Sequence, residues 1–391
     1  MASGLSQIVE IDALVSDVVL SPKERGTGKG HILIATGLIT PEILFNNGLL
    51  QNSIILYQMM ESMGYTCTLL VDKAPENKPA LLLNTYSYLL PETYLKNPFP
   101  IQVYIEIGMS LDVGWKKYLK GCGTKIVKLY LGNILNIDIE TTAITKGINF
   151  PHHKTGFLDE IWTSPHYAMN KDYASIINST KRTAIAPYVW DSCFIEDMTR
   201  WAAPSSWTIT DIVITEPNIS FQKCCFFPLL LADQFARRCP EWTGSIILQN
   251  TERLMNNLYF KDTILPELTI QKKGRLVLKG RQSIKDIVRE HPSAAFICHQ
   301  FNNDYNYMLL ELMTCNFPVL HNSVGWSSFG YTWNPDRWEE SLQQLATMLH
   351  SHSENLFSYR AQARQLAWKH SPWNPILRAE WNKLLQNETV L

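Results

Sequence analysis

Short apolar runs alternate along the chain with longer segments of mixed polarity, and this alternation predicts strands and helices in turn. The predicted strands are residues 31–36, 66–71, 102–107, 125–130, 157–162, 183–187, 211–215, 245–249, 276–279, 294–298 and 317–320. The main predicted helices are residues 49–63, 224–238, 307–315, 338–350, 355–369 and 376–386. Strands that alternate with helices favour an α/β fold with parallel sheets.

The chain is long enough for two domains. With 391 residues it exceeds what one ordinary hydrophobic core organises. Residues 191–204 have the polar, proline-containing character of an interdomain connection. We therefore expect an N-terminal domain at 1–192, a C-terminal domain at 205–370, and a last helical segment at 371–391 that crosses back to the first domain.

One predicted strand–helix–strand unit, residues 294–325, carries the most candidate chemistry. His299 begins the polar loop after its first strand, and His321 follows its second strand. In open α/β sheets, ligands bind outside the carboxyl ends of the strands. A neutral imidazole there can donate a hydrogen bond to a phosphate or a sugar hydroxyl, although a histidine near a core can equally be a structural group.

The helix of this unit is predicted to end at Asn316. Its polar stripe contains Tyr307, Glu311 and Thr314, while its leucines and methionines share the other side. We therefore expect Glu311 to face solvent or a cleft instead of the core. A carboxylate in a cleft can accept hydrogen bonds from both hydroxyls of a ribose.

Composition narrows the class of protein. The formal net charge is −1, so the composition gives no excess of positive charge that would attract nucleic acid or an acidic membrane. We expect no signal peptide and no transmembrane segment. The eight cysteines form no CxxC pair, so we expect a reducing, cytoplasmic compartment without disulfides or structural zinc.

The central unit also resembles a known family. Retaining glycosyltransferases of the GT-B type, in the glycosyltransferase family 4 group, have a glutamate, seven residues, a second glutamate, a small-residue turn and a Pro-Val strand. Glu311 matches the second glutamate and Pro318-Val319 match the strand, whereas Asn303 occupies the position of the first glutamate. Glycosyltransferases of large DNA viruses of algae are also similar, through His299-Gln300, Asn306-Tyr307 and His321-Asn322-Ser323.

This resemblance implies a fold and an activity. The expected fold is GT-B, with two Rossmann-like parallel-sheet domains facing across a cleft, the first holding the acceptor and the second the donor. The implied reaction moves a hexose from a nucleotide diphosphate sugar, with GDP-mannose as the first choice, to a glycan or protein-linked glycan. It retains the anomeric configuration and needs no metal or other cofactor. A virus-encoded enzyme would work in the host cytoplasm, and a homodimer is compatible with the resemblance.

The resemblance also assigns roles to residues. Lys223, near a predicted helix start, would hold the donor diphosphate, because a helix N-terminus and an ammonium group both favour an anion. Lys223, His299 and Asn303 are the catalytic candidates. Neutral Asn303 would bond a sugar hydroxyl but would not stabilise positive charge as a carboxylate does. The donor-binding candidates are Glu311, Lys223, Arg281, Lys279, Tyr307, Asn306, Asn218 and, in the first domain, Gly48.

The sequence is also compatible with other functions. A nucleotide-sugar epimerase or hydrolase of the same fold would use the same donor site. A non-catalytic sugar-nucleotide-binding protein would explain Asn303 in place of glutamate. Lys223 and Arg281 can also be solvated charges near helix starts that bind no ligand. Glu311 can likewise be an ordinary exposed residue of its helix.

Overall fold

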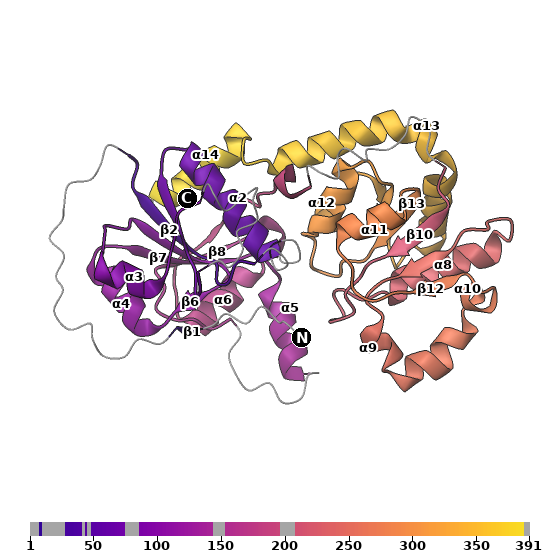
Figure 1. The fold of residues 1–391 in the computed structure, drawn as a ribbon, viewed down its shortest axis with the longest axis horizontal. Coiled ribbons are helices and arrows are strands. Elements are labelled where there is room, and N and C mark those ends of the chain that lie inside the picture. The colour runs from indigo at the N-terminus through magenta and orange to yellow at the C-terminus, as the bar shows by residue number, and fades with distance from the viewer. Residues whose placement is uncertain are drawn as a thin grey trace. The chain divides into compact units, whose positions relative to one another are not determined.

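The computed structural model describes residues 8–9, 28–40, 44, 48–74, 86–143, 153–195 and 208–386. Its contacts divide the chain into two compact units, one formed by Met1–Asp191 with His370–Leu391 and the other by Ser192–Lys369 (Figure 1). Each unit has its own parallel β-sheet with helices packed on it, so the predicted α/β class and the two separate sheets are confirmed. Most of the predicted connection at 191–204 lies outside the described residues.

The first unit contains a seven-stranded sheet in the order β4-β3-β2-β5-β7-β8-β9. Every neighbouring pair is parallel. Its strands are β2 (His31–Ala35), β3 (Thr66–Leu70), β4 (Tyr88–Leu89), β5 (Val103–Glu106), β7 (Lys125–Tyr130), β8 (Glu160–Thr163) and β9 (Thr183–Ile185). Its helices are α2 (Gly48–Ser62), α3 (Pro91–Lys96), α4 (Val113–Gly121), α5 (Ile134–Ala143), α6 (Asn170–Asn178) and α14 (Pro375–Gln386). A separate two-stranded sheet pairs β1 (Ile8–Val9) with β6 (Ser110–Leu111).

The second unit contains a six-stranded sheet in the order β12-β11-β10-β13-β14-β15, again parallel throughout. Its strands are β10 (Asp211–Ile214), β11 (Ile246–Leu248), β12 (Leu276–Leu278), β13 (Ala294–Cys298), β14 (Val319–His321) and β15 (Tyr331–Thr332). Its helices are α8 (Phe226–Arg238), α9 (Glu252–Met255), α10 (Thr269–Lys272), α11 (Ile284–Glu290), α12 (Tyr307–Thr314) and α13 (Trp338–His370). Numbered by their order along the chain, these strands run 3-2-1-4-5-6 across the sheet, which is the Rossmann arrangement.

Two helices predicted near the C-terminus are in fact one. Residues 338–370 form the continuous helix α13 of 33 residues. The residues between the two predicted helices include no glycine or proline to stop the helix. His352 lies in this stretch and is buried, with its ring against Tyr359 and its Nδ1 within 3.1 Å of the Tyr331 hydroxyl. The polar stretch therefore belongs to a packed helix and not to a loop.

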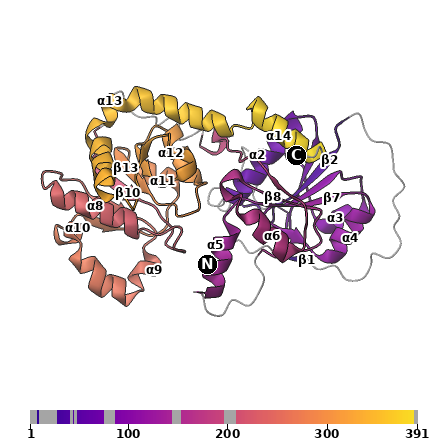
Figure 2. The same cartoon turned by 180° about the vertical axis from the view of Figure 1, so that it is seen from behind.

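The last helix, α14, packs on the first unit, as both views show (Figures 1 and 2). Trp381 is 1% exposed, and its indole N–H donates to the carbonyl of Pro187 at 3.1 Å. Arg378 donates to the carbonyl of Ser62 at 2.8 Å, beside the end of α2. The segment after α13 thus completes the core of the unit that contains the N-terminal half of the chain.

The first unit also buries three charged side chains, which lie on strands β5 and β7 and on helix α4. Glu106 and Lys116 form an ion pair at 3.0 Å with both side chains fully buried. Lys128, opposite Glu106 in the register, donates to the Ile107 carbonyl and the Ser110 hydroxyl, each at 3.3 Å. Burial lowers the pKa of Lys128 to about 8, which the Glu106 carboxylate opposes and the Lys116 charge reinforces.

Candidate functional site

The site is built where the strand order of the second unit reverses. The first strand of that unit, β10, lies between β11 and β13, so the chain moves outward from it in both directions. Helices leaving these neighbouring strands diverge, and the crevice at their carboxyl ends is where open α/β sheets bind ligands. The residues that follow β10 and β13 therefore define the candidate site.

Glu216 and His299 meet at this crevice. The Glu216 carboxylate oxygen Oε1 accepts a hydrogen bond from the backbone N–H of His299 at 2.8 Å, and Glu216 is only 1% exposed. Burial raises the pKa of Glu216 to about 8, while the His299 N–H and the charge of Lys223 act in the opposite direction. Glu216 thus joins the two strand ends, and its carboxyl lies close enough to Lys223 for each group to affect the pKa of the other.

The ring of His299 is held in one orientation. Asn322 Oδ1 accepts the backbone N–H of Gln300 at 2.6 Å, which turns the amide nitrogen of Asn322 toward His299 Nδ1, 3.3 Å away. Nδ1 is therefore the acceptor, and the hydrogen of the neutral ring lies on Nε2. Phe227 stacks on the ring at 5.0 Å, and burial lowers the pKa of His299 to about 4. The result is a neutral, oriented N–H donor.

Several buried polar atoms at this edge of the sheet have no hydrogen-bond partner among the described residues. They are His299 Nε2, both side-chain polar atoms of Gln300, Gln222 Oε1 and Gln249 Oε1. All four side chains are at most 3% exposed. Leaving a buried donor or acceptor unpaired costs about 1–3 kcal/mol, and buried polar atoms are normally paired. Such a cluster is the arrangement expected of a site that hydrogen-bonds a ligand.

Lys223 lies in the loop between β10 and α8. Its backbone N–H donates to the Ser220 carbonyl at 3.2 Å, and its carbonyl accepts from Asn218 at 3.1 Å. Burial lowers the pKa of Lys223, and the Glu216 carboxylate opposes this change. Helix α8 begins at Phe226, two residues later than predicted, so Lys223 precedes the helix N-terminus instead of sitting on it.

Asn218 shapes this loop. It has a left-handed backbone conformation with φ of 54°, and its side-chain oxygen accepts the Cys225 N–H at 2.9 Å. Its amide nitrogen donates to the Asn250 carbonyl at 3.2 Å. Both polar atoms of the side chain are therefore used to hold the loop, and the part of Asn218 in ligand binding stays a prediction.

Helix α12 has the expected ends but an unexpected buried carboxyl. Asn306 caps its first turn by accepting the Met308 N–H at 3.0 Å, and Asn316 follows its end with φ of 64°. Glu311 is 7% exposed, so it does not face open solvent, and its place in a cleft stays a prediction. Helix α12 is covered on the Glu311 side as well, and burial raises the pKa of Glu311 to about 7, with Lys285 of α11 opposing.

The remaining sequence candidates are placed as follows. Tyr307 begins α12 and is half-buried, and Asn303 is half-buried in the loop after β13. At the edge strand β12, Lys279 forms an ion pair with Glu290, while the side chain of Arg281 is exposed. Gly48 begins α2 in the first unit. The structure thus brings His299 and Lys223 together through Glu216, and it places Lys279 and Arg281 two strands from β10.

Sequence analysis gave no individual role to five residues of this site: Glu216, Gln222 and Gln249, which it did not name, and Gln300 and Asn322, which it named only as part of the family resemblance. A common signal existed for three of them, because Glu216, Gln249 and Gln300 stand one or two residues after a buried strand. His321, in contrast, is a structural residue. Its Nε2 lies 2.8 Å from the Phe329 carbonyl, and its Nδ1 accepts the Ser323 N–H at 3.2 Å.

Two Rossmann-like parallel-sheet units, with buried polar side chains at the switch point of the second, define the GT-B class of fold, and solved structures agree. An alpha-glucosyltransferase in complex with UDP and a 13-mer DNA matches with a TM-score of 0.61 and 12% identity, over 92% of this chain and 100% of that chain. A glycosyltransferase from Rickettsia africae ESF-5 matches with a TM-score of 0.58 and 11% identity, over 92% and 98%. The lipopolysaccharide outer core galactosyltransferase WaaB, in its apo form, matches with a TM-score of 0.53 and 10% identity, over 92% and 100%.

By sequence, residues 34–385 match the family described as "Protein of unknown function (DUF2827)", and the chain belongs to that family. No curated protein matches the chain significantly. Among the helices of the described residues, none has the length and apolar character needed to cross a membrane.

Proposed function

We propose that this protein is a glycosyltransferase that takes its sugar from a nucleotide diphosphate donor bound at the switch point of the second unit. The observation that carries the proposal is the cluster of buried, unpartnered polar atoms of Gln222, Gln249, His299 and Gln300. Together they offer three acceptors and two donors, a mixture that suits sugar and ribose hydroxyls, because each hydroxyl both donates and accepts. The fold shared with glycosyltransferases supports the same assignment.

The chemistry assigned to the site is a displacement at the anomeric carbon. The bond from that carbon to the diphosphate oxygen breaks, and a bond to an acceptor hydroxyl oxygen forms. The hydroxyl proton leaves with the diphosphate or passes to solvent. Lys223 stabilises the negative charge that grows on the leaving oxygen, which is the usual largest contribution in such sites.

The neutral N–H of His299 bonds the donor sugar or its phosphate in this proposal. Because burial holds the pKa of His299 near 4, the ring stays neutral over the physiological range and acts as a donor without charge. Asn303, in the loop after the same strand, supplies an amide toward the sugar. Retention of configuration, GDP-mannose as donor and a glycan as acceptor remain parts of the proposal that rest on the resemblance described above.

The test is calorimetric titration of the whole chain with UDP-glucose, UDP-galactose, GDP-mannose and ADP-glucose, followed by product analysis with the donor that binds. The proposal expects one of them to bind and to release free nucleotide diphosphate with a glycosylated acceptor. A changed sugar nucleotide as product would identify an epimerase instead. Lack of binding to all four at millimolar concentration would contradict the donor site itself.

A further inference from the structure

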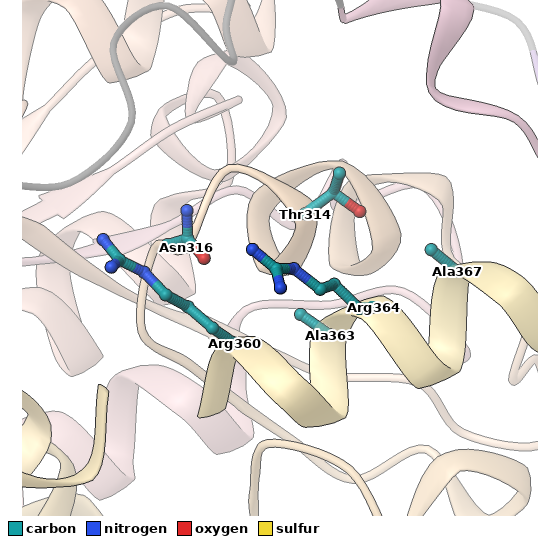
Figure 3. A pocket seen from close by; sticks show the side chains of 6 residues that line it. All are labelled: Thr314, Asn316, Arg360, Ala363, Arg364 and Ala367. Atoms are coloured by element: carbon teal, nitrogen blue, oxygen red, sulfur yellow. The ribbon is translucent and has the colours of Figure 1, made fainter. Parts of the chain in front are cut away.

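A second candidate site is a pocket at the other end of α12, away from the switch point. It has a volume of about 320 Å³ and is lined by Thr314, Asn316, Arg360, Ala363, Arg364 and Ala367 (Figure 3). Thr314 is the last residue of α12, whereas Asn306, at the other end, caps the turn beside the crevice. At 1.5 Å per residue, the eight residues of α12 separate the two sites by about 12 Å.

Two guanidinium groups dominate this second pocket. Arg360 and Arg364 are four residues apart on α13, so they project from the same face, and in Figure 3 both extend toward the turn that contains Asn316. No carboxylate lines the pocket. No hydrogen bond or ion pair joins Arg364 to any residue that the structure describes. Like charges at this spacing are mildly unfavourable, and an anion bound between them would remove that repulsion.

The end of α12 does not cancel this positive charge. The last carbonyls of a helix carry roughly half a negative charge, which is less than the full positive charge of Arg364 alone. Thr314 and Asn316 add a hydroxyl and an amide that can donate hydrogen bonds. Planar guanidinium groups are the protein groups best suited to bind a phosphate or carboxylate through two parallel hydrogen bonds.

Exposed aromatic rings flank the arginines along the same face of α13. Phe357 is 89% exposed and precedes Arg360 by three residues, and Trp368 is 54% exposed and follows Arg364 by four. This spacing keeps all four side chains on one stripe of the helix. Flat apolar rings beside a cationic pocket match a ligand that joins an anionic group to a ring with an apolar face. The pocket volume falls in the range of small-molecule sites.

We infer that this pocket binds a phosphorylated saccharide, with the phosphate between Arg360 and Arg364 and the sugar ring against the neighbouring aromatic face of α13. The site is separate from the proposed donor site and does not depend on it. It lies wholly within the second unit and uses residues that the switch-point chemistry leaves unused.

The experiment is calorimetric titration with glucose 6-phosphate, inorganic phosphate and glucose. Arg364→Gln is the main variant, because its exposed side chain can be replaced without disturbing the core, and Arg360→Gln is the second. Arg337→Gln is the matched control, since Arg337 is an exposed arginine just before the same helix but outside the pocket. We expect glucose 6-phosphate to bind the parent and the control equally and to lose about tenfold or more in affinity in either pocket variant, as when a charge-assisted hydrogen bond is removed.

Two further variants separate the parts of the inference. Phe357→Ala should weaken glucose 6-phosphate and leave inorganic phosphate unchanged, and equal affinities of the parent for these two probes would overturn the saccharide component. Lys223→Ala should leave binding intact. Loss of binding in Lys223→Ala, or affinity unaltered by both arginine substitutions, would overturn the site, because the probe would then occupy the switch point or an unrelated surface.

Discussion

The Glu216 carboxylate accepts the backbone N–H of His299 at 2.8 Å and thereby joins the carboxyl ends of two parallel strands that are far apart in sequence. The bond leaves the imidazole of His299 free to be oriented by Asn322. It also places a carboxyl group close enough to Lys223 to affect its pKa. One buried side chain therefore connects the backbone geometry of the crevice to its electrostatics.

Gln300→Leu should stabilise the ligand-free protein and weaken its donor binding. The Gln300 side chain is 3% exposed and both of its polar atoms lack a partner, so a leucine of similar volume removes their desolvation penalty of about 1–3 kcal/mol. The same change removes a donor and an acceptor from the proposed site. Thermal unfolding without ligand and calorimetry with the donor measure the two effects.

The control for this variant is Gln365→Leu, at an exposed position on α13. It should change neither quantity appreciably. A Gln300→Leu protein that unfolds at a lower temperature than the parent would mean that Gln300 is satisfied in solution, for example by bound water, and it would remove Gln300 from the argument for the site.

Glu311→Gln should alter both the pH dependence of stability and nucleotide binding. The pKa of Glu311 is about 7 in the folded chain and about 4.5 when unfolded. Between these values the folded state holds a proton that the unfolded state has lost, so the carboxyl lowers stability as pH rises from 4.5 to 7. The shift corresponds to about 3 kcal/mol. Relative to the parent, the variant should therefore be more stable at pH 8 than at pH 4.5, as measured by urea unfolding.

If Glu311 also holds the donor ribose, its affinity for the nucleotide diphosphate should fall about tenfold or more, because a charge-assisted hydrogen bond is lost. Unchanged nucleotide affinity, together with the expected gain in stability at pH 8, would identify Glu311 as a buried structural carboxyl only.

Lys223→Ala should slow turnover more than it weakens donor binding. Charge on the leaving diphosphate oxygen is greatest in the transition state, so its stabilisation affects the rate most. Loss of a preorganised group of this kind costs about 2.7–4 kcal/mol of barrier, a rate loss of a hundredfold or more. Single-turnover kinetics measure the step, and EDTA is included to test the expected metal independence. If the variant reacts at the parental rate, a group other than Lys223 stabilises the leaving diphosphate. If EDTA inactivates the parent protein, a metal ion is required.

Lys128→Met should abolish the increase in the free energy of unfolding of the first unit as pH rises above 8. The pKa of Lys128 is about 8 when folded and 10.5 when unfolded. Over that window the unfolded chain binds a proton that the folded chain has released, so the parent gains stability as pH rises from 8 to 10.5. The variant should lack this gain, whereas Lys117→Met, at an exposed position on α4, should keep it. Identical slopes in all three proteins would show that Lys128 is hydrated.

The longer strands were predictable because they are compact apolar runs, and β13 coincides with its predicted residues, all five of them buried. The two-residue strands β4, β6 and β15 were not predicted, because so short a pairing leaves no run of apolar residues. Strand β8 is the instructive exception, since it begins at Glu160 and not at residue 157. Gly156 and Phe157 both have positive φ, at 64° and 53°, which no strand residue adopts. Hydrophobicity alone carries no information about that backbone reversal.

The position of the site was predictable in part. Polar residues after buried strands of a parallel sheet fall at one edge, which is how His299 was found. Which of those residues meet depends on strand order and register, and neither can be read from local sequence. Glu311 shows the complementary limit, because a helical wheel separates polar from apolar positions but cannot show that the polar position is buried in the folded chain.

The first unit is assembled from two pieces of chain that are separated by the whole of the second unit. During synthesis, β2 to β9 emerge long before Trp381 can fill its place beside Trp162 and Pro187. The second unit is continuous in sequence, so all of its strands have been synthesised before Trp381 is. Domains generally fold as units during synthesis. The unit that begins first in the sequence is therefore the last to receive all of its residues. A fragment that stops before α14 would therefore leave the N-terminal unit without the Trp381 side chain that packs on Trp162, whereas the second unit is made from one continuous stretch of chain.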